Sequence, residues 1–374
     1  MQNRAYRSLT PLGDGRTPFQ KEQRKRFNKP TAGRGVSTMV SLKDISARCN
    51  VSVATVSKAL NDHKDVSAAT KERIIKTAKE MGYFPNSQAR ALKTNRTFNL
   101  GVMFTDEAGR GLTHEFFAKV LNSFKTEAEQ LGYDITFINK NIGGKHMSTY
   151  EHCRYRNVDG IAMICTDFSD PDVYEVVNGD LPLVTIDHVF ECRSAVVSNN
   201  ETGIEELIDY VYSMGHRSIA FIQGKRSAVM ERRLNGFVRA CMNRGIEVEP
   251  ERMLSGEYHS PQITYELTKK LLESGSRPTC IFMPDDYSAI GGYNAIKDHG
   301  LRIPEDISVV GYDGIAYSEF LSPQLTSYKQ NTAKIGSLAA KKLISHIESP
   351  ATTLTEVITV DGAIQTGASV ANIL

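Results

Sequence analysis

Residues 42–61 read Leu42-Lys-Asp-Ile-Ser-Ala-Arg-Cys-Asn-Val-Ser-Val-Ala-Thr-Val-Ser-Lys-Ala-Leu-Asn61. The pattern indicates two short helices joined by a tight turn at Asn50-Val51, with Ile45 and Ala47 on the apolar face of the first helix. Ser52 is a natural N-cap for the second helix, because its hydroxyl can accept a hydrogen bond from a free backbone N–H of the first turn. We therefore predict a helix-turn-helix.

The second helix of this segment has an inner and an outer face. Val56, Ala59 and Leu60 point inward, which leaves the other face free to enter the major groove of DNA. Val53 and Ala54 carry no side-chain donor, so they can read only groove shape and thymine methyl groups. We expect the DNA-contacting residues here to be Ser52, Val53, Ala54, Thr55, Ser57, Lys58 and Asn61.

A third helix is predicted over the residues that follow. Ser67 begins it with a capping box, and Gly82 ends it. The residues at helical spacing between them are Ile74, Ile75, Ala78 and Met81. The whole block strongly resembles the headpiece of the LacI/GalR family of bacterial transcription regulators, and the resemblance continues to the C-terminus.

The resemblance implies two further features of DNA binding. Residues 86–93 match the hinge helix of the family, of which two copies pair in the minor groove and each wedges a leucine into the central base step. The hinge residues implied here are Asn86, Ala89 and Leu92. Lys58 stands where the family usually has arginine, and lysine grips a guanine less rigidly than arginine does. Relatives with the Val-Ala pair commonly read operators with a central CG step.

The charge distribution fits a protein that meets nucleic acid at one end. Residues 41–97 hold about eleven Lys and Arg against about five Asp and Glu, whereas residues 98–374 are acidic. The six cysteines are scattered without a CxxC pair, which fits reduced thiols in the cytoplasm and gives no metal site. No signal-peptide core or transmembrane run is visible, so a cytoplasmic location without membrane contact is expected.

Residues 1–38 precede the block that resembles the family. They are rich in Arg, Lys, Gly, Pro and Thr. We expect either an upstream translation start, with Met39 as the true initiator, or a disordered basic arm that adds unspecific affinity for DNA.

From Asn99 onward, short apolar strands alternate with amphipathic helices. Strands are expected at 100–104, 133–138, 158–164, 183–187, 218–222, 279–283 and 307–313. This alternation predicts parallel sheets covered by helices on both faces, and ligands of such sheets bind beyond the carboxyl ends of the strands.

The fold class implied is an all-α helix-turn-helix headpiece followed by an α/β body like that of periplasmic binding proteins, with two parallel-sheet subdomains. The expected division is a headpiece at 39–85, a hinge helix and linker at 86–97 and an effector-binding and dimerisation domain at 98–374. Within that domain, the first subdomain is expected at about 98–196 plus 329–350, and the second at about 197–328 plus 351–374.

Polar residues at strand ends are the candidates for effector contact. Asp187 and Asp313 each end an apolar strand, and Arg233 matches the Arg-x-x-Gly-Phe motif whose arginine grips the effector in the family. Tyr258 and Asp285 complete the set, with Asp285 where relatives usually have asparagine. Carboxylates with one arginine suit sugar hydroxyls, and an aromatic ring suits the apolar face of a sugar. The alternative for each residue is a helix cap or an Asx turn.

Catalytic patterns are sparse. The nine histidines show no metal-binding spacing, and no phosphate loop or nucleophile elbow is present. We expect a homodimeric, non-enzymatic repressor of carbohydrate-use genes without a cofactor, which binds a pseudopalindromic operator and a small sugar-like effector. Two alternatives stay open, namely control by a phosphorylated carrier protein as corepressor and a sugar-processing enzyme with an accessory DNA-binding domain. Ser227 stands nearest to an arginine that purine-binding relatives carry, which argues against a nucleobase.

Overall fold

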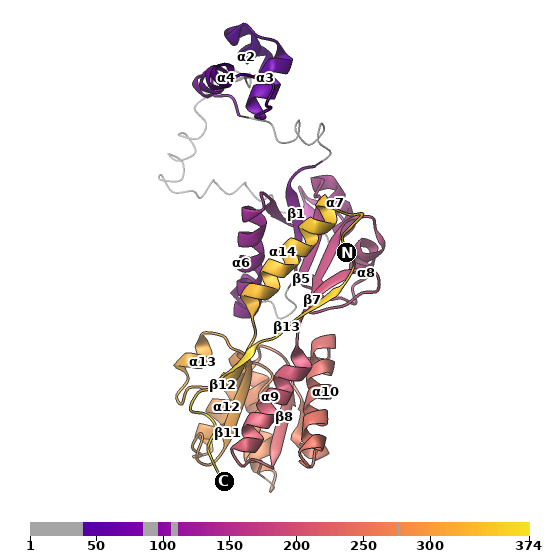
Figure 1. Ribbon diagram of the computed structural model, residues 1–374. Helices are drawn as coiled ribbons and strands as arrows, with labels where there is room; N and C mark the ends of the chain where they lie inside the picture. The colour runs from indigo at the N-terminus through magenta and orange to yellow at the C-terminus, as the bar shows by residue number, and fades with distance from the viewer. Residues whose placement is uncertain (1–39, 85–95, 106–110, 276) are drawn as a thin grey trace, which may run out of the picture. The chain divides into compact units, whose positions relative to one another are not determined.

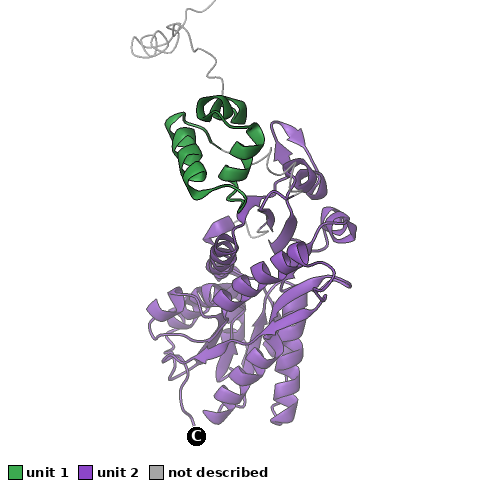
Figure 2. Ribbon diagram, turned by 45° about the horizontal axis from the view of Figure 1, so that its top comes forward, with its two compact units in different colours: residues 1–87 green, residues 88–374 purple. Residues whose placement is uncertain are grey.

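The computed structural model describes residues 40–84, 96–105, 111–275 and 277–374. The chain divides into two compact units, Met1–Ser87 and Gln88–Leu374, which Figure 2 colours separately. The residue 1–38 extension lies outside the described residues. No helix in the described ranges has both the length and the apolar character needed to span a membrane.

Within residues 40–84, the described part of unit 1 is a bundle of three short helices, α2 (Leu42–Cys49), α3 (Val53–Leu60) and α4 (Ala68–Glu80). Asn50 closes α2 in the left-handed conformation, with φ of 50°, which asparagine tolerates better than most residues. The Ser52 hydroxyl accepts the backbone N–H of Thr55 at 3.0 Å and so begins α3, as expected. The helix-turn-helix is thereby confirmed in its turn and its cap.

The core of unit 1 holds the buried residues Ile45, Cys49, Val56, Ala59, Val66, Ile74 and Ala78. Three details of the sequence interpretation were wrong. Ala47 is exposed. Cys49, which lies one turn after Ile45, is buried in its place. Ile75 is 40% exposed. The Ser67 hydroxyl donates to the Thr70 hydroxyl at 2.8 Å and accepts the Thr70 backbone N–H, without the reciprocal bond of a capping box, whereas Ser41 and Asp44 form one at the start of α2.

Unit 2 contains two six-stranded sheets and a two-stranded one, β3 (Asn141–Ile142) with β4 (Lys145–His146). The first six-stranded sheet has the order β13-β7-β6-β5-β1-β2, with every neighbouring pair parallel. Its strands are β1 (Asn99–Phe104), β2 (Asp134–Phe137), β5 (Gly160–Cys165), β6 (Leu183–Ile186), β7 (Ser194–Ser198) and β13 (Val357–Val360).

Helices cover both faces of the first sheet, because its strands are apolar on both sides. The helices of this subdomain are η1 (Gly111–Thr113), α6 (Glu115–Gln130), α7 (Thr149–Arg156), α8 (Pro171–Asn178) and α14 (Thr332–Glu348). Figure 1 shows α6 and α14 side by side. Residues of these two helices share one core cluster with β1, β5, β6 and β7, and a second cluster joins α7 and α8 to the sheet.

The second sheet has the order β14-β12-β11-β10-β8-β9 and is parallel except for β14, which runs antiparallel to β12. Its strands are β8 (Ile219–Gln223), β9 (Met253–Ser255), β10 (Cys280–Phe282), β11 (Ser308–Asp313), β12 (Thr326–Lys329) and β14 (Ala363–Gln365). Its helices are α9 (Asn200–Ser213), α10 (Ala228–Asn243), η2 (Pro250–Arg252), α11 (Pro261–Glu273), α12 (Asp286–Asp298) and α13 (Tyr317–Phe320). Helices α9 and α10 share one core cluster with this sheet, while α11 and α12 share another.

The chain passes between the two sheets three times, after β7, after β12 and after β13. The expected assignment of residues 351–374 to the second subdomain was therefore wrong for β13, which pairs with β7 in the first sheet. The third crossing falls between Val360 and Ala363. The carboxyl ends of β7, β12 and β13 are thus the connections between the subdomains.

Candidate DNA-binding and effector-binding sites

The outer face of α3 presents little polar chemistry. Val53 is 42% exposed, and Ala54, Lys58 and Asn61 are exposed as well, whereas Ser57 is half-buried. Small apolar side chains at the start of a groove-reading helix allow a close approach to the bases and contact with thymine methyl groups. The placement of the predicted contact residues is compatible with that use.

Some of the predicted DNA contacts also hold the helix together. The Thr55 hydroxyl lies 2.8 Å from that of Ser52, which already accepts the Thr55 backbone N–H. The Asn61 side-chain amide donates to the carbonyl of Ser57 at 2.7 Å. The hydroxyls and the amide therefore have structural roles. Val53, Ala54 and Lys58 are the exposed residues of α3 that remain as candidates for direct contact with the bases.

Lys58 forms an ion pair within the headpiece. Its ammonium contacts the carboxylate of Asp65, in the loop between α3 and α4. A second pair in the same loop joins Nζ of Lys71 to Oδ1 of Asp62 at 2.6 Å. Each lysine lowers the pKa of its carboxylate partner, chiefly through the hydrogen bond that it donates, so both carboxylates are ionised at neutral pH.

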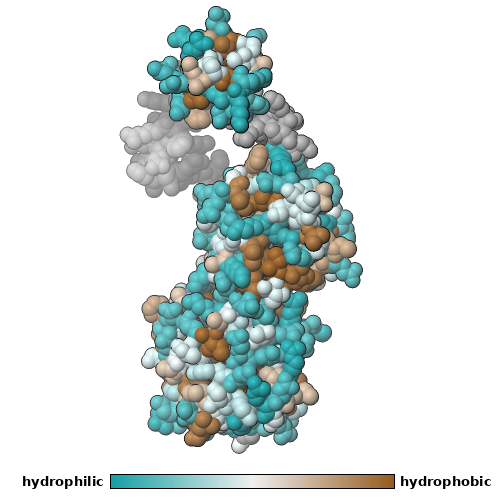
Figure 3. Space-filling view, in the orientation of Figure 1, coloured by the Kyte–Doolittle hydropathy of each residue, from teal (hydrophilic) through white to brown (hydrophobic). Residues whose placement is uncertain are grey.

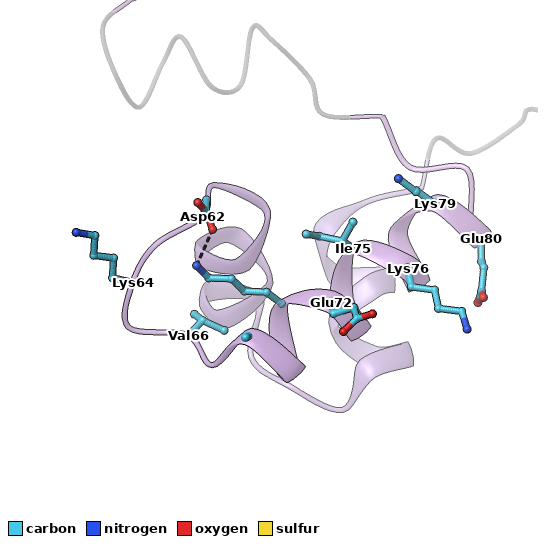
Figure 4. A pocket seen from close by; sticks show the side chains of 10 residues that line it. Asp62, Lys64, Val66, Glu72, Ile75, Lys76, Lys79 and Glu80 are labelled. Atoms are coloured by element: carbon cyan, nitrogen blue, oxygen red, sulfur yellow. Dashed lines mark hydrogen bonds and ion pairs between the residues drawn. The ribbon is translucent and has the colours of Figure 1, made fainter.

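The second of these pairs borders a shallow hollow against the outer side of α4 (Figure 4). The hollow is lined by Asp62, Lys64, Val66, Ala68, Lys71, Glu72, Ile75, Lys76, Lys79 and Glu80. Lysines and acidic residues both line the hollow, so it lacks the concentration of positive charge and backbone N–H groups that binds a phosphate. We assign no ligand to this surface.

The hinge prediction lies outside the described residues. Asn86, Ala89 and Leu92 all fall within the range 85–95. The described chain resumes at Arg96, where the Asp159 carboxylate accepts the backbone N–H groups of Thr97 and Phe98, each at 2.8 Å. These bonds fix the point at which the linker enters the body.

Arg233 is the centre of a buried polar cluster in unit 2. Its side chain is 5% exposed. Nε donates to Oδ1 of Asn200 at 2.9 Å, and Nη1 donates to the carbonyl of Pro284 at 3.1 Å. The guanidinium also lies 3.6 Å from the ring centroid of Tyr312, a cation–π contact that strengthens when water is excluded. Although burial disfavours the charged form, Tyr258, Tyr312 and the nearby carboxylates raise the pKa of Arg233.

Asp313 joins this cluster from the end of β11. Its Oδ1 lies 3.4 Å from Nη2 of Arg233 and accepts the side-chain amide of Gln330 at 2.7 Å. Burial raises the pKa of Asp313 to about 6, although Arg233 acts in the opposite direction. Oε1 of Gln330 is buried and has no hydrogen-bond partner within the part of the chain that the structure describes. Such an atom usually marks the place of a ligand or water.

Asp187 and Tyr258 lie close to the same cluster. Asp187 follows β6 with φ of 58°, and its Oδ1 accepts the backbone N–H of Ser198 at 2.7 Å. Burial raises the pKa of Asp187, while Arg233 and Arg232 lower it. The Tyr258 ring lies 5.7 Å from the Arg233 guanidinium. It packs so tightly over Gly224 that a Cβ there would lie 2.3 Å from the ring.

The geometry does not support the predicted effector contact of Asp285. This carboxylate is fully buried and caps α12, accepting the backbone N–H of Ser288 at 2.8 Å. Its other oxygen accepts the Ser288 hydroxyl at 2.7 Å and the backbone N–H of His259 at 2.9 Å. Protein donors thus occupy both oxygens, and the helix-cap alternative explains why an acid stands here.

Three members of the cluster were missed from the sequence, namely Asn200, Tyr312 and Gln330. Asn200 begins α9 two residues after the end of β7, and Gln330 comes directly after β12, where the chain crosses between subdomains. The rule that ligands meet strand ends would have selected them, but neither strand was recognised. Tyr312 lies inside β11, where an aromatic residue reads as core.

Comparison with known proteins decides the family. Residues 41–86 match the model described as bacterial regulatory proteins, lacI family, and residues 208–370 match the periplasmic binding protein-like domain. A probable HTH-type transcriptional repressor, ExuR of Bacillus subtilis (strain 168), is 31% identical over 318 residues, which cover 84% of this chain and 93% of that protein. The chain belongs to the LacI family. It is a DNA-binding transcriptional regulator with an effector-binding domain.

Further relatives and solved structures are similar to most of this chain. The HTH-type transcriptional repressor PurR of Vibrio vulnificus (strain CMCP6) is 31% identical over 83% of this chain and 92% of its own length. Among solved structures, the lac repressor dimer bound to operator and the anti-inducer ONPF has a TM-score of 0.75 at 24% identity, over 89% of this chain and all of that one. The complex of the regulator CelR with cellobiose has a TM-score of 0.64 at 22% identity, over 88% and 99% of the two chains. These structures share the fold of this chain.

Proposed function

We propose that this LacI-family protein is a homodimeric repressor of carbohydrate-use genes that acts in the cytoplasm without catalysing a reaction. A small sugar-like effector binds the body between the ends of β7, β11 and β12 and alters the affinity of the headpiece for a pseudopalindromic operator. Val53, Ala54 and Lys58 read the major groove, while Asn86, Ala89 and Leu92 serve as the hinge in the minor groove.

The buried cluster around Arg233 supports an effector rich in hydroxyl groups. Arg233, Asp313 and Gln330 offer a cation, an anion and an amide within one hydrogen-bonded group. Hydroxyl groups can both donate and accept, so one sugar can satisfy an arginine and a carboxylate at once. The observation that carries the proposal is the buried Oε1 of Gln330, which finds no donor in the described ranges and would accept one from a hydroxyl group.

The names of the relatives leave two classes of effector to compare. One structural neighbour is a complex with cellobiose, whereas several relatives bear the name PurR. Ser227 caps α10 by accepting the backbone N–H of Met230 at 3.2 Å, so this position offers no cation to a nucleobase. A sugar therefore fits these residues better than a purine.

Dimerisation is proposed through an apolar surface of the body. Figure 3 shows apolar surface gathered around α14 and β13. Val357 on β13 is 47% exposed, and the nearby Leu354 is 76% exposed. A dimer would bring two headpieces to two half-sites, as helix-turn-helix proteins require. An effector that favours one arrangement of the two subdomains would then shift the DNA-competent population.

Thermal unfolding of the full-length protein with a panel of neutral sugars, sugar acids and purines tests this proposal. We expect one sugar to raise the melting temperature in a concentration-dependent manner, as ligand linkage requires, and to change operator affinity. Arg233→Ala should abolish both responses while DNA binding persists, and the exposed Arg239→Ala on the same helix should abolish neither. If Arg233→Ala does not fold, Gln330→Ala replaces it.

Two results would contradict the proposed effector. Stabilisation by a purine alone would assign the site to a nucleobase. If no small molecule changes the melting temperature or the operator affinity, and a phosphorylated carrier protein tightens operator binding, the corepressor alternative is favoured.

A further inference from the structure

The loop between α3 and α4 contains two carboxylates, and each of them pairs with a lysine of a neighbouring helix. Asp65 pairs with Lys58 of α3, whose side chain is 49% exposed. Asp62 pairs with Lys71 of α4, whose side chain is only 18% exposed. The two pairs have the same chemistry, but only one involves a residue that the proposed function places in the major groove.

Lys58 has one positive charge for two possible partners. Its ammonium has three N–H donors but is a compact point charge without the planar fork of arginine, so the carboxylate of Asp65 offsets the charge that DNA would otherwise meet. While Lys58 contacts Asp65, its charge is neutralised and it releases no counterions from DNA. A phosphate or a base edge therefore competes with Asp65 for this one charge, and the carboxylate next to Lys58 repels any phosphate that Lys58 approaches.

We propose that Asp65 is a positioning residue that competes with DNA for Lys58 and thereby weakens the binding of the headpiece to every DNA sequence. Asp65 acts through Lys58 and touches no base itself. The inference rests on the proposed contact of Lys58 with DNA. The carboxylate of Asp65 would thus set how tightly the repressor binds both its operator and unspecific DNA.

The pair is suited to such a role because it is weak enough to exchange. Both side chains are about half exposed, and exposed ion pairs are screened by salt and easily broken. Removal of the carboxylate should therefore free one cation and remove one negative charge from the DNA-facing surface. By analogy with other surface pairs, we expect an effect of about three- to tenfold on affinity at low salt.

The test uses full-length protein and a mixed-sequence duplex of about 20 base pairs, the length of two half-sites. Binding is followed by fluorescence anisotropy over a range of salt concentrations for Asp65→Asn and Asp62→Asn. The second variant is a matched control, because it removes the same charge from the same loop but releases Lys71. Asp65→Asn should tighten binding about three- to tenfold and steepen the salt dependence by about one released counterion, and Asp62→Asn should do less.

A second set of variants distinguishes an effect of Asp65 that acts through Lys58 from a general effect of net charge. In a Lys58→Ala background, the gain from Asp65→Asn should shrink to that of Asp62→Asn, while Asp65→Glu should stay near the wild type. Equal gains from Asp65→Asn and Asp62→Asn, or weaker binding by Asp65→Asn with unchanged thermal unfolding, would overturn the inference.

The same series tests the proposed function separately. Lys58→Ala alone should weaken binding to a selected operator roughly five- to 150-fold. If it leaves both operator and mixed-sequence binding unchanged, the proposed DNA contact of Lys58 fails, and the role of Asp65 fails with it. If Lys58→Ala weakens binding but Asp65→Asn matches its control, only the role of Asp65 is wrong.

Discussion

At the scale of single residues, two aspartates occupy matching places in the two subdomains. Asp187 follows β6 and Asp313 ends β11, with φ angles of 58° and 104°. Residues other than glycine are strained in this region of backbone space and persist only where their surroundings hold them, often at functional sites. Both carboxylates lie close enough to Arg233 to influence its charge, so the strain places two anions against one buried cation.

Asp313 should make stability depend on pH. Its pKa is about 6 in the folded protein, raised by burial from an ordinary 3.8. A raised pKa means that the contribution to stability is fully present below the unfolded pKa and is lost as pH rises through about 6. The loss is at most roughly 3 kcal/mol for a shift of about two units. Asp313→Asn cannot titrate, so its free energy of unfolding should rise relative to the wild type between pH 4 and 7.

Urea denaturation of both proteins at several pH values measures this difference. Arg233, Asp285 and His259, the charged or titratable neighbours that act on Asp313, are present in both proteins, so each protein serves as the control for the other. A difference between the two proteins that stays constant from pH 4 to 7 would contradict the raised pKa.

At the scale of elements, α6 and α14 approach each other closely at one glycine. A Cβ on Gly336 of α14 would lie 2.3 Å from the carbonyl oxygen of Val120 and 2.7 Å from the backbone nitrogen of Phe124. Both atoms belong to the backbone of α6, which cannot turn aside as a flexible side chain can. The close packing of α6 against α14 therefore requires glycine at position 336.

Gly336→Ala should destabilise the body. The added methyl group forces α14 away from α6, and overpacking of this kind typically lowers the free energy of unfolding by about 1–3 kcal/mol. Gly275→Ala is the control, because a Cβ there meets nothing within 4 Å. Denaturant unfolding that shows equal stability for the two variants would mean that the helices separate without loss.

The elements that the sequence predicted best are those with a strong local pattern. The strands expected at 100–104 and 183–187 correspond to β1 and β6. Strands β7, β12 and β13 were missed although they are no shorter than β6, which also has four residues, and each lies next to a crossing. Periodicity shows that a strand is buried, but it cannot show which sheet the strand joins, hence the wrong assignment of β13.

In the candidate site too, the sequence predicted the residues with a local signal and missed those that depend on tertiary structure. Arg233 and Asp313 were predicted and lie in one ion pair, because the motif and the strand end are local features. Asn200 and Gln330 were missed because their importance depends on two crossings that only the tertiary structure reveals. Asp285 looked like an effector contact because a carboxylate after a strand can either cap the next helix or face a ligand, and the sequence cannot distinguish the two.

At the scale of the whole molecule, the central claim is that a headpiece with few base-reading donors recognises an operator under the control of the body. The family assignment establishes a DNA-binding regulator. The proposed operator rests on α3, where Val53 and Ala54 favour a close approach to the bases, and on the hinge residues that we propose to pair in a dimer.

Selection of genomic fragments by the full-length protein at near-physiological salt tests that claim most directly. The account predicts repeated recovery of one pseudopalindrome with a central CG step, beside genes for carbohydrate transport or breakdown. Those genes would then name the sugars to test against Arg233→Ala. Fragments without a shared motif, recovered by a folded dimer in the presence and absence of sugars, would contradict the account.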